Sequence, residues 1–109
     1  MARPPQVYLV SYDVRWPDPA DEHAGQRRLG KVYRLLRGFG DPIQKSVFRC
    51  TLSDLQRAHL EERLDQIIHK QLDQVLFVHL GAAGARTSWR THTLGVPLLD
   101  PARSCRIIG

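Results

Sequence analysis

The sequence predicts an α+β protein in which helices pack in one layer against one face of a β-sheet. Three observations lead to this prediction. Residues 7–14 form a strand-like run that opens the chain. Two helical patterns follow, over roughly 21–37 and 54–72, each with an apolar stripe. After each helical pattern comes another strand-like run, at residues 43–50 and 75–80.

The opening strand is apolar on both of its faces at its start. Because strand side chains alternate, the run Val7–Val14 presents two different sets of residues. Both faces therefore need cover. The chain's own helices supply one cover, and in a chain this short a second subunit is the natural source of the other. The two sets are Tyr8, Val10, Tyr12 and Val14 on one face, and Val7, Leu9, Ser11 and Asp13 on the other.

Turn residues Trp16-Pro17-Asp18-Pro19 separate this strand from the first helix. The helix carries an apolar stripe at the spacing of a buried face, and Gly38 and Gly40 end it. Basic residues recur at the same spacing on another face of the helix, which favours a second, charged surface. The apolar stripe is Leu29, Val32, Tyr33 and Leu36, and the basic residues are Arg27, Lys31 and Arg34, with Arg37 close by.

The second half of the chain repeats the alternation of strand and helix. Ser53 and Gln56 form a capping box that starts the second helix, whose buried stripe runs from Leu60 to Leu72. Gly81 to Gly84 reads as a flexible break. A polar strand at 88–94 and a terminal strand at 105–108 complete the expected elements. Periodicity alone leaves the order of strands in the sheet open.

Length, composition and charge restrict the class of protein. The 109 residues fit a single domain, with residues 1–6 as an N-terminal tail and 95–109 as a C-terminal loop and strand. No apolar run approaches the roughly 20 residues that span a bilayer, and no secretory signal opens the chain, so we expect a cytoplasmic protein without membrane contact. Because the cytoplasm is reducing, we expect Cys50 and Cys105 to be small, buried hydrophobic residues.

Positive charge is concentrated at the two ends of the chain. The net charge is +5, and residues 1–50 hold nine Lys and Arg against five acids, whereas residues 51–74 hold three against five. This distribution favours a polyanionic partner through counterion release, although a merely soluble basic protein is equally compatible with it. The five histidines are dispersed and show no zinc spacing.

Four segments, taken together and in order, resemble a known family. Over most of residues 7–96 the chain resembles the Cas-two family of small CRISPR-associated endonucleases, which partner the integrase in spacer acquisition. The segments are Tyr12-Asp13-Val14, Leu35-Leu36-Arg37-Gly38-Phe39-Gly40, Gln44-Lys45-Ser46-Val47-Phe48 and Asp73-Gln74-Val75-Leu76-Phe77.

The resemblance implies a ferredoxin-like two-layer sandwich, with an antiparallel sheet and two helices on one face. It also implies a homodimer in which the two sheets face each other, and a C-terminal strand that extends the partner's sheet. The implied partners are the CRISPR integrase and RNA or DNA. This expectation agrees with an opening strand that is apolar on both faces.

Asp13 is the main candidate for catalysis. It stands where the first strand ends, a usual place for chemistry, and it is an isolated acid among many arginines, which suggests a metal held against phosphates. The resemblance implies that Asp13 is the catalytic, metal-binding residue, with Mg²⁺ or another divalent cation as cofactor. A twofold axis would bring two such carboxylates together around the cation. Alternatively, Asp13 caps a turn or pairs with Arg15.

The basic residues are candidates for phosphate binding, because guanidinium and ammonium groups bind nucleic-acid backbones without reading sequence. A solvated helix face is the alternative for those on the helix. Near the aspartate, the resemblance places Tyr12, Ser46 and Phe48 as structural residues, and Trp16 either stacks on a base or holds its loop. The candidate nucleic-acid-binding residues are Arg15, Arg27, Lys31, Arg34, Arg37 and Lys45.

Two functions follow from these expectations. The first is a metal-dependent endonuclease that hydrolyses RNA or DNA in CRISPR spacer acquisition and antiviral defence. The second is a non-catalytic dimer that binds DNA and bridges integrase subunits. A third reading, a small-molecule regulatory module on the same fold, does not explain the surplus of arginine.

Overall fold

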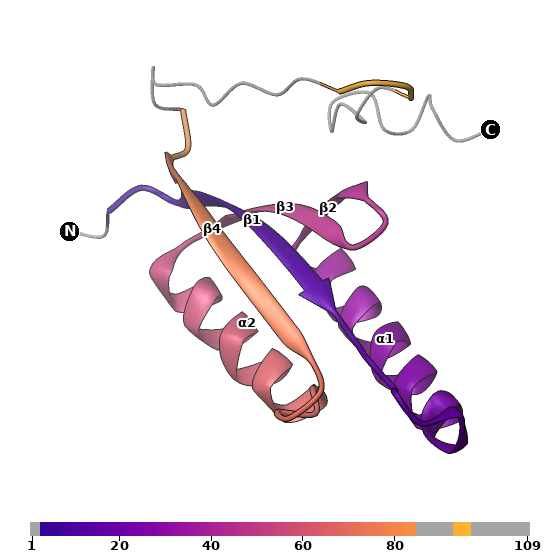
Figure 1. Ribbon diagram of the computed structural model, residues 1–109. Helices are drawn as coiled ribbons and strands as arrows, with labels where there is room; N and C mark the ends of the chain where they lie inside the picture. The colour runs from indigo at the N-terminus through magenta and orange to yellow at the C-terminus, as the bar shows by residue number, and fades with distance from the viewer. Residues whose placement is uncertain (1–2, 85–92, 97–109) are drawn as a thin grey trace.

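The computed structural model describes residues 3–84 and 93–96 (Figure 1). Strands and helices alternate in the order βαββαβ, with one short 3₁₀ helix at Pro19–Asp21 before the first α-helix. The elements are β1 (Gln6–Asp13), α1 (Glu22–Arg37), β2 (Gly40–Gln44), β3 (Val47–Leu52), α2 (Asp54–Ile67) and β4 (Gln74–Ala82).

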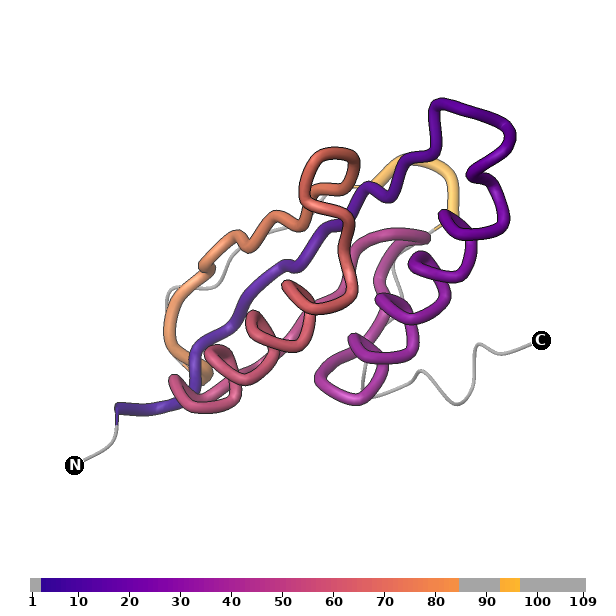
Figure 2. Tube along the Cα trace, turned by 90° about the horizontal axis from the view of Figure 1, so that it is seen from below, coloured from indigo at the N-terminus to yellow at the C-terminus, as the bar shows by residue number. Residues whose placement is uncertain are grey.

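The four strands form one antiparallel sheet in the order β2-β3-β1-β4. Both helices lie on the same face of this sheet, and they run side by side along it (Figures 1 and 2). This arrangement is the ferredoxin-like two-layer sandwich, so the predicted fold class is confirmed. Its topology places β1 in the interior of the sheet, between β3 and β4.

The core lies between the sheet and the helices, and β1 contributes alternate residues to it. Tyr8, Val10 and Tyr12 are all at most 6% exposed, as the alternation of the strand predicts. Cys50 is fully buried among them, and this burial raises the pKa of its thiol to about 11, so it behaves as the predicted small hydrophobe. The other buried core residues are Val32, Leu36, Phe48, Leu52, Leu60 and Leu64.

The opposite face of the sheet carries apolar side chains that are accessible to solvent. On β4, Leu76 is 53% exposed and Val78 is 41% exposed. They lie opposite Ser11 and Leu9 of β1 in the strand register. Within the described residues, no helix is long and apolar enough to cross a membrane.

The expectation of one strand over residues 43–50 is wrong, because the chain reverses direction inside this segment. β2 and β3 form a hairpin whose turn is Lys45-Ser46. The sequence hides this turn, since it lacks the glycine, asparagine or proline that marks a tight reversal. Gly40 begins β2 and does not end α1, which stops at Arg37 with Gly38 as its C-cap.

The second helix is shorter than predicted. The capping box of Ser53 and Gln56 is present, but α2 ends at Ile67, and Ile68 is already extended. Leu72 therefore lies in a turn after the helix, where its N–H donates to the His69 carbonyl oxygen at 3.1 Å. The predicted strand at 75–80 extends to Ala82, so the break at Gly81–Gly84 narrows to a turn at Ala83-Gly84.

The predicted C-terminal elements fall largely outside the described residues. The strand expected at 88–94 includes two described residues, Thr93 and Leu94, and neither is in a strand. The terminal strand at 105–108, and with it the predicted exchange into a partner's sheet, lies outside the described part of the chain.

Candidate active site

Asp13 is the last residue of β1, and its side chain is 51% exposed. The alternation of the strand puts it on the sheet face that the helices do not cover, in register with Gln74 of β4. The Arg15 guanidinium donates to the Asp13 carboxylate through Nε at 2.8 Å, so the pairing expected as an alternative does occur. Because Arg15 is itself 70% exposed, this ion pair is open to exchange with solvent ions.

A second acid, Asp73, fixes the loop that follows Asp13. Its side chain is wholly inaccessible, and it pairs with Arg28 of α1, which donates Nε at 2.8 Å and Nη2 at 3.2 Å. The backbone of Arg15 is held twice, because its N–H donates to Asp73 at 3.1 Å and its carbonyl accepts from Arg28 at 2.9 Å. The N–H of His69 donates to Asp73 at 2.8 Å. One buried carboxylate therefore joins the loop after β1, helix α1 and the turn between α2 and β4.

The ionisation of Asp73 reflects these contacts. Burial alone would raise the pKa of this carboxyl group, since it penalises the charged form. The hydrogen bonds from Arg28, His69 and Arg15, together with the charge of Arg28, outweigh burial and hold the pKa of Asp73 below its ordinary value. The buried carboxylate therefore stays charged at neutral pH.

Tyr12 ties the hairpin turn to the site. Its hydroxyl donates to the Lys45 carbonyl at 3.2 Å, and its N–H donates to the Ser46 carbonyl at 3.1 Å. These two bonds place the β2–β3 turn, with the exposed Lys45 side chain, beside the strand end that carries Asp13. Burial, with a smaller contribution from Tyr33, raises the pKa of Tyr12, so its hydroxyl remains a donor.

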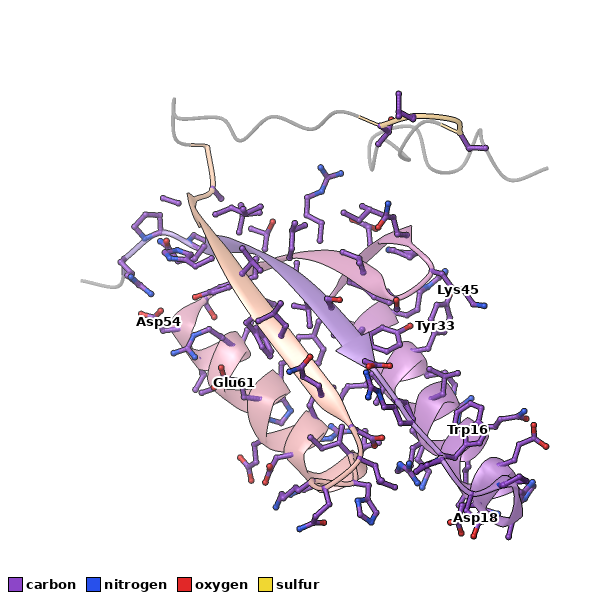
Figure 3. The ribbon with its side chains drawn as sticks, in the orientation of Figure 1. Trp16, Asp18, Tyr33, Lys45, Asp54 and Glu61 are labelled. Atoms are coloured by element: carbon purple, nitrogen blue, oxygen red, sulfur yellow. The ribbon has the colours of Figure 1, made fainter. Side chains whose placement is uncertain are left out.

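An open cavity of about 740 Å³ adjoins Asp13. Its walls are the end of β1, the loop at Trp16, one side of α1 and the β2–β3 turn. Figure 3 shows Lys45, Tyr33 and Trp16 along the same side of the molecule, following α1. The cavity brings together four predicted site residues besides Asp13: Tyr12, Arg34, Lys45 and Ser46.

The other predicted residues lie around this cavity and not in it. Phe48 is fully buried in the core, where its ring contacts Tyr12 and Tyr33 at centroid distances of 6.2 and 5.5 Å. Arg27 and Lys31 are exposed on α1, and Arg15 lines an adjacent hollow with Trp16. Lys31 and Arg34 also line a groove toward α2 with Arg63. The candidate basic residues are thus spread over α1 and several neighbouring hollows and do not converge on a point.

Sequence reasoning misses the Arg28–Asp73 pair. Nothing singles out Arg28, because its neighbours Arg27 and Lys31 fit the charged stripe, and Asp73 reads as a turn before a strand. The two are 45 residues apart, so only the topology reveals their contact. The helical spacing predicts Tyr33 in the buried stripe, but this residue is 38% exposed and reaches the cavity.

Fold and site together define a small ferredoxin-like protein with a solvent-accessible acid set among cations at the end of its first strand. The sequence model of the family described as CRISPR associated protein Cas2 matches residues 6–87. The chain therefore belongs to the Cas2 family, which confirms the resemblance to the Cas-two family.

Individual relatives agree with this assignment. The chain is 36% identical over 98 residues to the CRISPR-associated endoribonuclease Cas2 of Nitratidesulfovibrio vulgaris, and the match covers 87% of each chain. It is 32% identical over 96 residues to a protein of the same name from Thermus thermophilus, covering 87% of this chain and 93% of the relative. The crystal structure of Streptococcus pyogenes Cas2 at pH 6.5 superposes with a TM-score of 0.66 and 36% identity, covering 82% and 99% of the two chains.

Proposed function

We propose that this chain forms a homodimeric endonuclease that hydrolyses phosphodiester bonds of RNA with the help of a divalent cation bound at Asp13, acting in the CRISPR system. The names of the relatives, CRISPR-associated endoribonucleases, support nuclease activity and favour RNA over DNA as the substrate. The homodimer and the divalent cation at Asp13 are inferred from the geometry of the site.

The position of Asp13 is the observation that carries the proposal. Its carboxylate lies on the uncovered sheet face, which also carries Leu9 of the same strand and the exposed Leu76 and Val78 of β4. A second copy of the chain, packed on this face about a twofold axis, would bury the apolar side chains. The same axis would bring the two Asp13 carboxylates toward each other.

The residues present fit a divalent cation shared between two chains. In the described part of the chain, no three His, Cys, Asp or Glu side chains gather closely enough to hold a metal ion, so a site at Asp13 needs ligands from elsewhere. Mg²⁺ commonly takes only one or two carboxylates and completes its shell with water and substrate phosphate. When bound, Mg²⁺ would polarise the phosphodiester and make the attacking water more acidic.

The chain's own residues supply the rest of the site. Arg15 neutralises and orients the Asp13 carboxylate at 2.8 Å while no nucleic acid is bound. Lys45 and Arg34, which line the cavity beside Asp13, can hold the phosphate of the cleaved bond. Asp73 and Arg28 keep the backbone of Arg15 fixed, so the strand end that carries Asp13 does not drift when its ion pair with Arg15 opens.

Replacing Asp13 with asparagine tests the function. The amide keeps the shape of the side chain but removes the charge that a cation needs. We expect Mg²⁺-dependent cleavage of single-stranded RNA to fall by at least about 10²-fold, the scale of losing a group at the reacting atoms. RNA affinity and subunit mass should be retained. Cleavage that persists in the pure variant would show that another residue or a contaminant carries the activity.

A second candidate function is the non-catalytic adaptor that holds duplex DNA and bridges integrase subunits. The observation in its favour is the line of exposed cations on α1, which extends well beyond the cavity at Asp13. Residues 27–37 span about 15 Å of helix, enough to follow several backbone phosphates. If this is the main role, the wild-type protein should cleave no RNA, and the Asp13→Asn protein should bind duplex DNA with the affinity and salt dependence of the wild type.

A further inference from the structure

The cavity beside Asp13 has walls of two different chemical kinds. Trp16 and Tyr33 supply aromatic surface, and Arg34 and Lys45 supply positive charge. Its volume of about 740 Å³ lies within the range of cavities that bind small organic groups. Phosphate alone would use only the cations, whereas the aromatic walls offer surface for a second, flat part of a ligand.

Both aromatic rings are held in place before any ligand arrives. Trp16 lies against Gly25 of α1 so closely that a Cβ added to this glycine would come 2.7 Å from the Trp16 Cδ2 atom. The Tyr33 ring meets Phe48 edge to face at 5.5 Å and 66°. The Arg37 guanidinium lies 6.0 Å from the centre of the same Tyr33 ring. Fixed rings lose little conformational entropy when a flat group packs on them.

The two cations of the cavity are available for an anion. Among the described residues, neither Arg34 nor Lys45 forms an ion pair with a carboxylate, whereas Asp13 is already paired with Arg15. Aromatic faces beside unpaired cations match the two parts of an unpaired nucleotide, a base that stacks and a phosphate that pairs. A base within a duplex is stacked on its neighbours and cannot enter.

We propose that this cavity is a base subsite: it holds the base of one unpaired nucleotide against Trp16 and Tyr33, and so sets where a single strand is cleaved relative to that base. The inference rests on the proposed nuclease function, because it takes Asp13 to mark the position of the cleaved phosphodiester. Arg34 and Lys45 then hold the phosphate that joins this nucleotide to its neighbour.

Binding of abasic RNA tests the base subsite without any cleavage. The protein is the full chain with Asp13→Asn and Trp89→Phe, so that Trp16 is the one remaining tryptophan and reports through its fluorescence. The probes are a short single-stranded RNA and the same RNA with a single abasic ribose placed at each position in turn. We expect the intact RNA to quench Trp16, and one abasic position to weaken binding about tenfold, the typical effect of losing one stacked base.

Three variants show whether the aromatic rings cause this effect. Tyr33→Leu and Gly25→Ala should weaken intact RNA about tenfold and remove the sensitivity to the abasic position. Gly25→Ala keeps the tryptophan but places a Cβ where the Trp16 ring lies, and a thermal unfolding curve of this variant shows whether a loss of binding occurs in the folded protein. Leu55→Ala removes an apolar side chain that is 81% exposed on α2 and should bind like the parent protein.

The outcomes separate this inference from the nuclease proposal. If anisotropy reports RNA binding while Trp16 fluorescence and all abasic probes remain unaffected, the base subsite is overturned, whatever the wild-type protein cleaves. If the wild-type protein cleaves no RNA but the abasic dependence appears as expected, the base subsite stands as a binding site and the nuclease proposal fails.

Discussion

Two aspartates at the same end of the sheet have opposite environments. Asp13 is half exposed and pairs with an exposed arginine, whereas the side chain of Asp73 is inaccessible and accepts hydrogen bonds from three residues. An acid that is fully enclosed by donors serves structure, and an acid that keeps solvent access is free to meet a ligand. The contrast assigns a structural role to Asp73 and leaves Asp13 as the candidate for chemistry.

Replacing Asp73 with asparagine should lower stability. The variant leaves the Arg28 guanidinium, whose side chain is only 16% exposed, without a carboxylate. We expect the free energy of unfolding at pH 7 to fall by roughly 3 kcal/mol, measured by urea denaturation. Asp65→Asn is the matched control, because Asp65 pairs with Lys70 where both side chains are 62% exposed, and it should change little.

The pH dependence of the Asp73→Asn effect has a defined sign. The pKa of Asp73 is lowered in the folded protein, so its contribution is complete above the ordinary aspartate pKa of about 3.9 and is lost as pH falls through the folded pKa. The stability curves of wild type and Asp73→Asn should therefore converge below about pH 4. Curves that stay parallel through this range would contradict the assigned charge on Asp73.

At the scale of elements, the β2–β3 hairpin builds one wall of the site, and its two strands approach closely at Gly40. A Cβ at this position would lie 2.5 Å from Cys50 Sγ and closer still to the Arg49 carbonyl oxygen. Cys50 belongs to the core, so it cannot withdraw without disturbing its neighbours. Gly40 therefore allows β2 and β3 to pack closely against each other.

Gly40→Ala should destabilise the fold by about 1–3 kcal/mol, because it overpacks this contact. Thermal unfolding monitored by circular dichroism measures the effect. Gly38→Ala is the matched control in the same segment, since a Cβ there meets only the Leu35 carbonyl oxygen, at 3.3 Å. Equal losses in the two variants would mean that the close approach at Gly40 is not the cause.

Elements with a local signal were predictable, and those that depend on distant contacts were not. Alternation identified β1, spacing identified α1, and a capping box identified the start of α2. The turn at Lys45-Ser46 escaped because its residues carry no backbone signature. The end of α2 was also missed, because the turn after it is held by Asp73, which accepts from the His69 N–H.

The candidate site also has parts that were visible in the sequence and parts that were not. Asp13 was found because a lone acid at a strand end is visible in the sequence, and its role stays a prediction. The cavity was not predictable, since Trp16, Tyr33 and Lys45 come from three segments that only the folded chain assembles. Sequence therefore identified the carboxylate and several residues near it, but not the cavity that they form together.

At the scale of the whole molecule, one face of the sheet is covered by helices and the other presents apolar side chains. Leu76 and Val78 on this second face are 53% and 41% exposed, and Asp13 lies at its edge. The proposed function has this face meet a second copy, which would bury the apolar side chains and add a second Asp13 carboxylate to the site.

Leu76→Glu should therefore separate the subunits. The substitution occurs twice in a twofold dimer and replaces buried apolar area with charge, so the dimer Kd should rise by at least about 10²-fold. Light scattering would then shift from twice the 12.5 kDa mass of the chain to that mass itself. Leu55→Glu makes the same change on α2, on the other side of the molecule, and should leave the mass unaltered. A monomeric wild-type protein would refute the dimer.

The place of β1 in the sheet has a consequence for biosynthesis. This first strand is flanked by β4, whose residues leave the ribosome long after it, and the carboxylate that holds the Arg15 backbone comes from Asp73 just before β4. A nascent chain that ends before this point has Asp13 but lacks the carboxylate that accepts from the Arg15 N–H. The strand end that carries Asp13 therefore gains its last sheet neighbour and its Asp73 contact only after translation has passed the second helix.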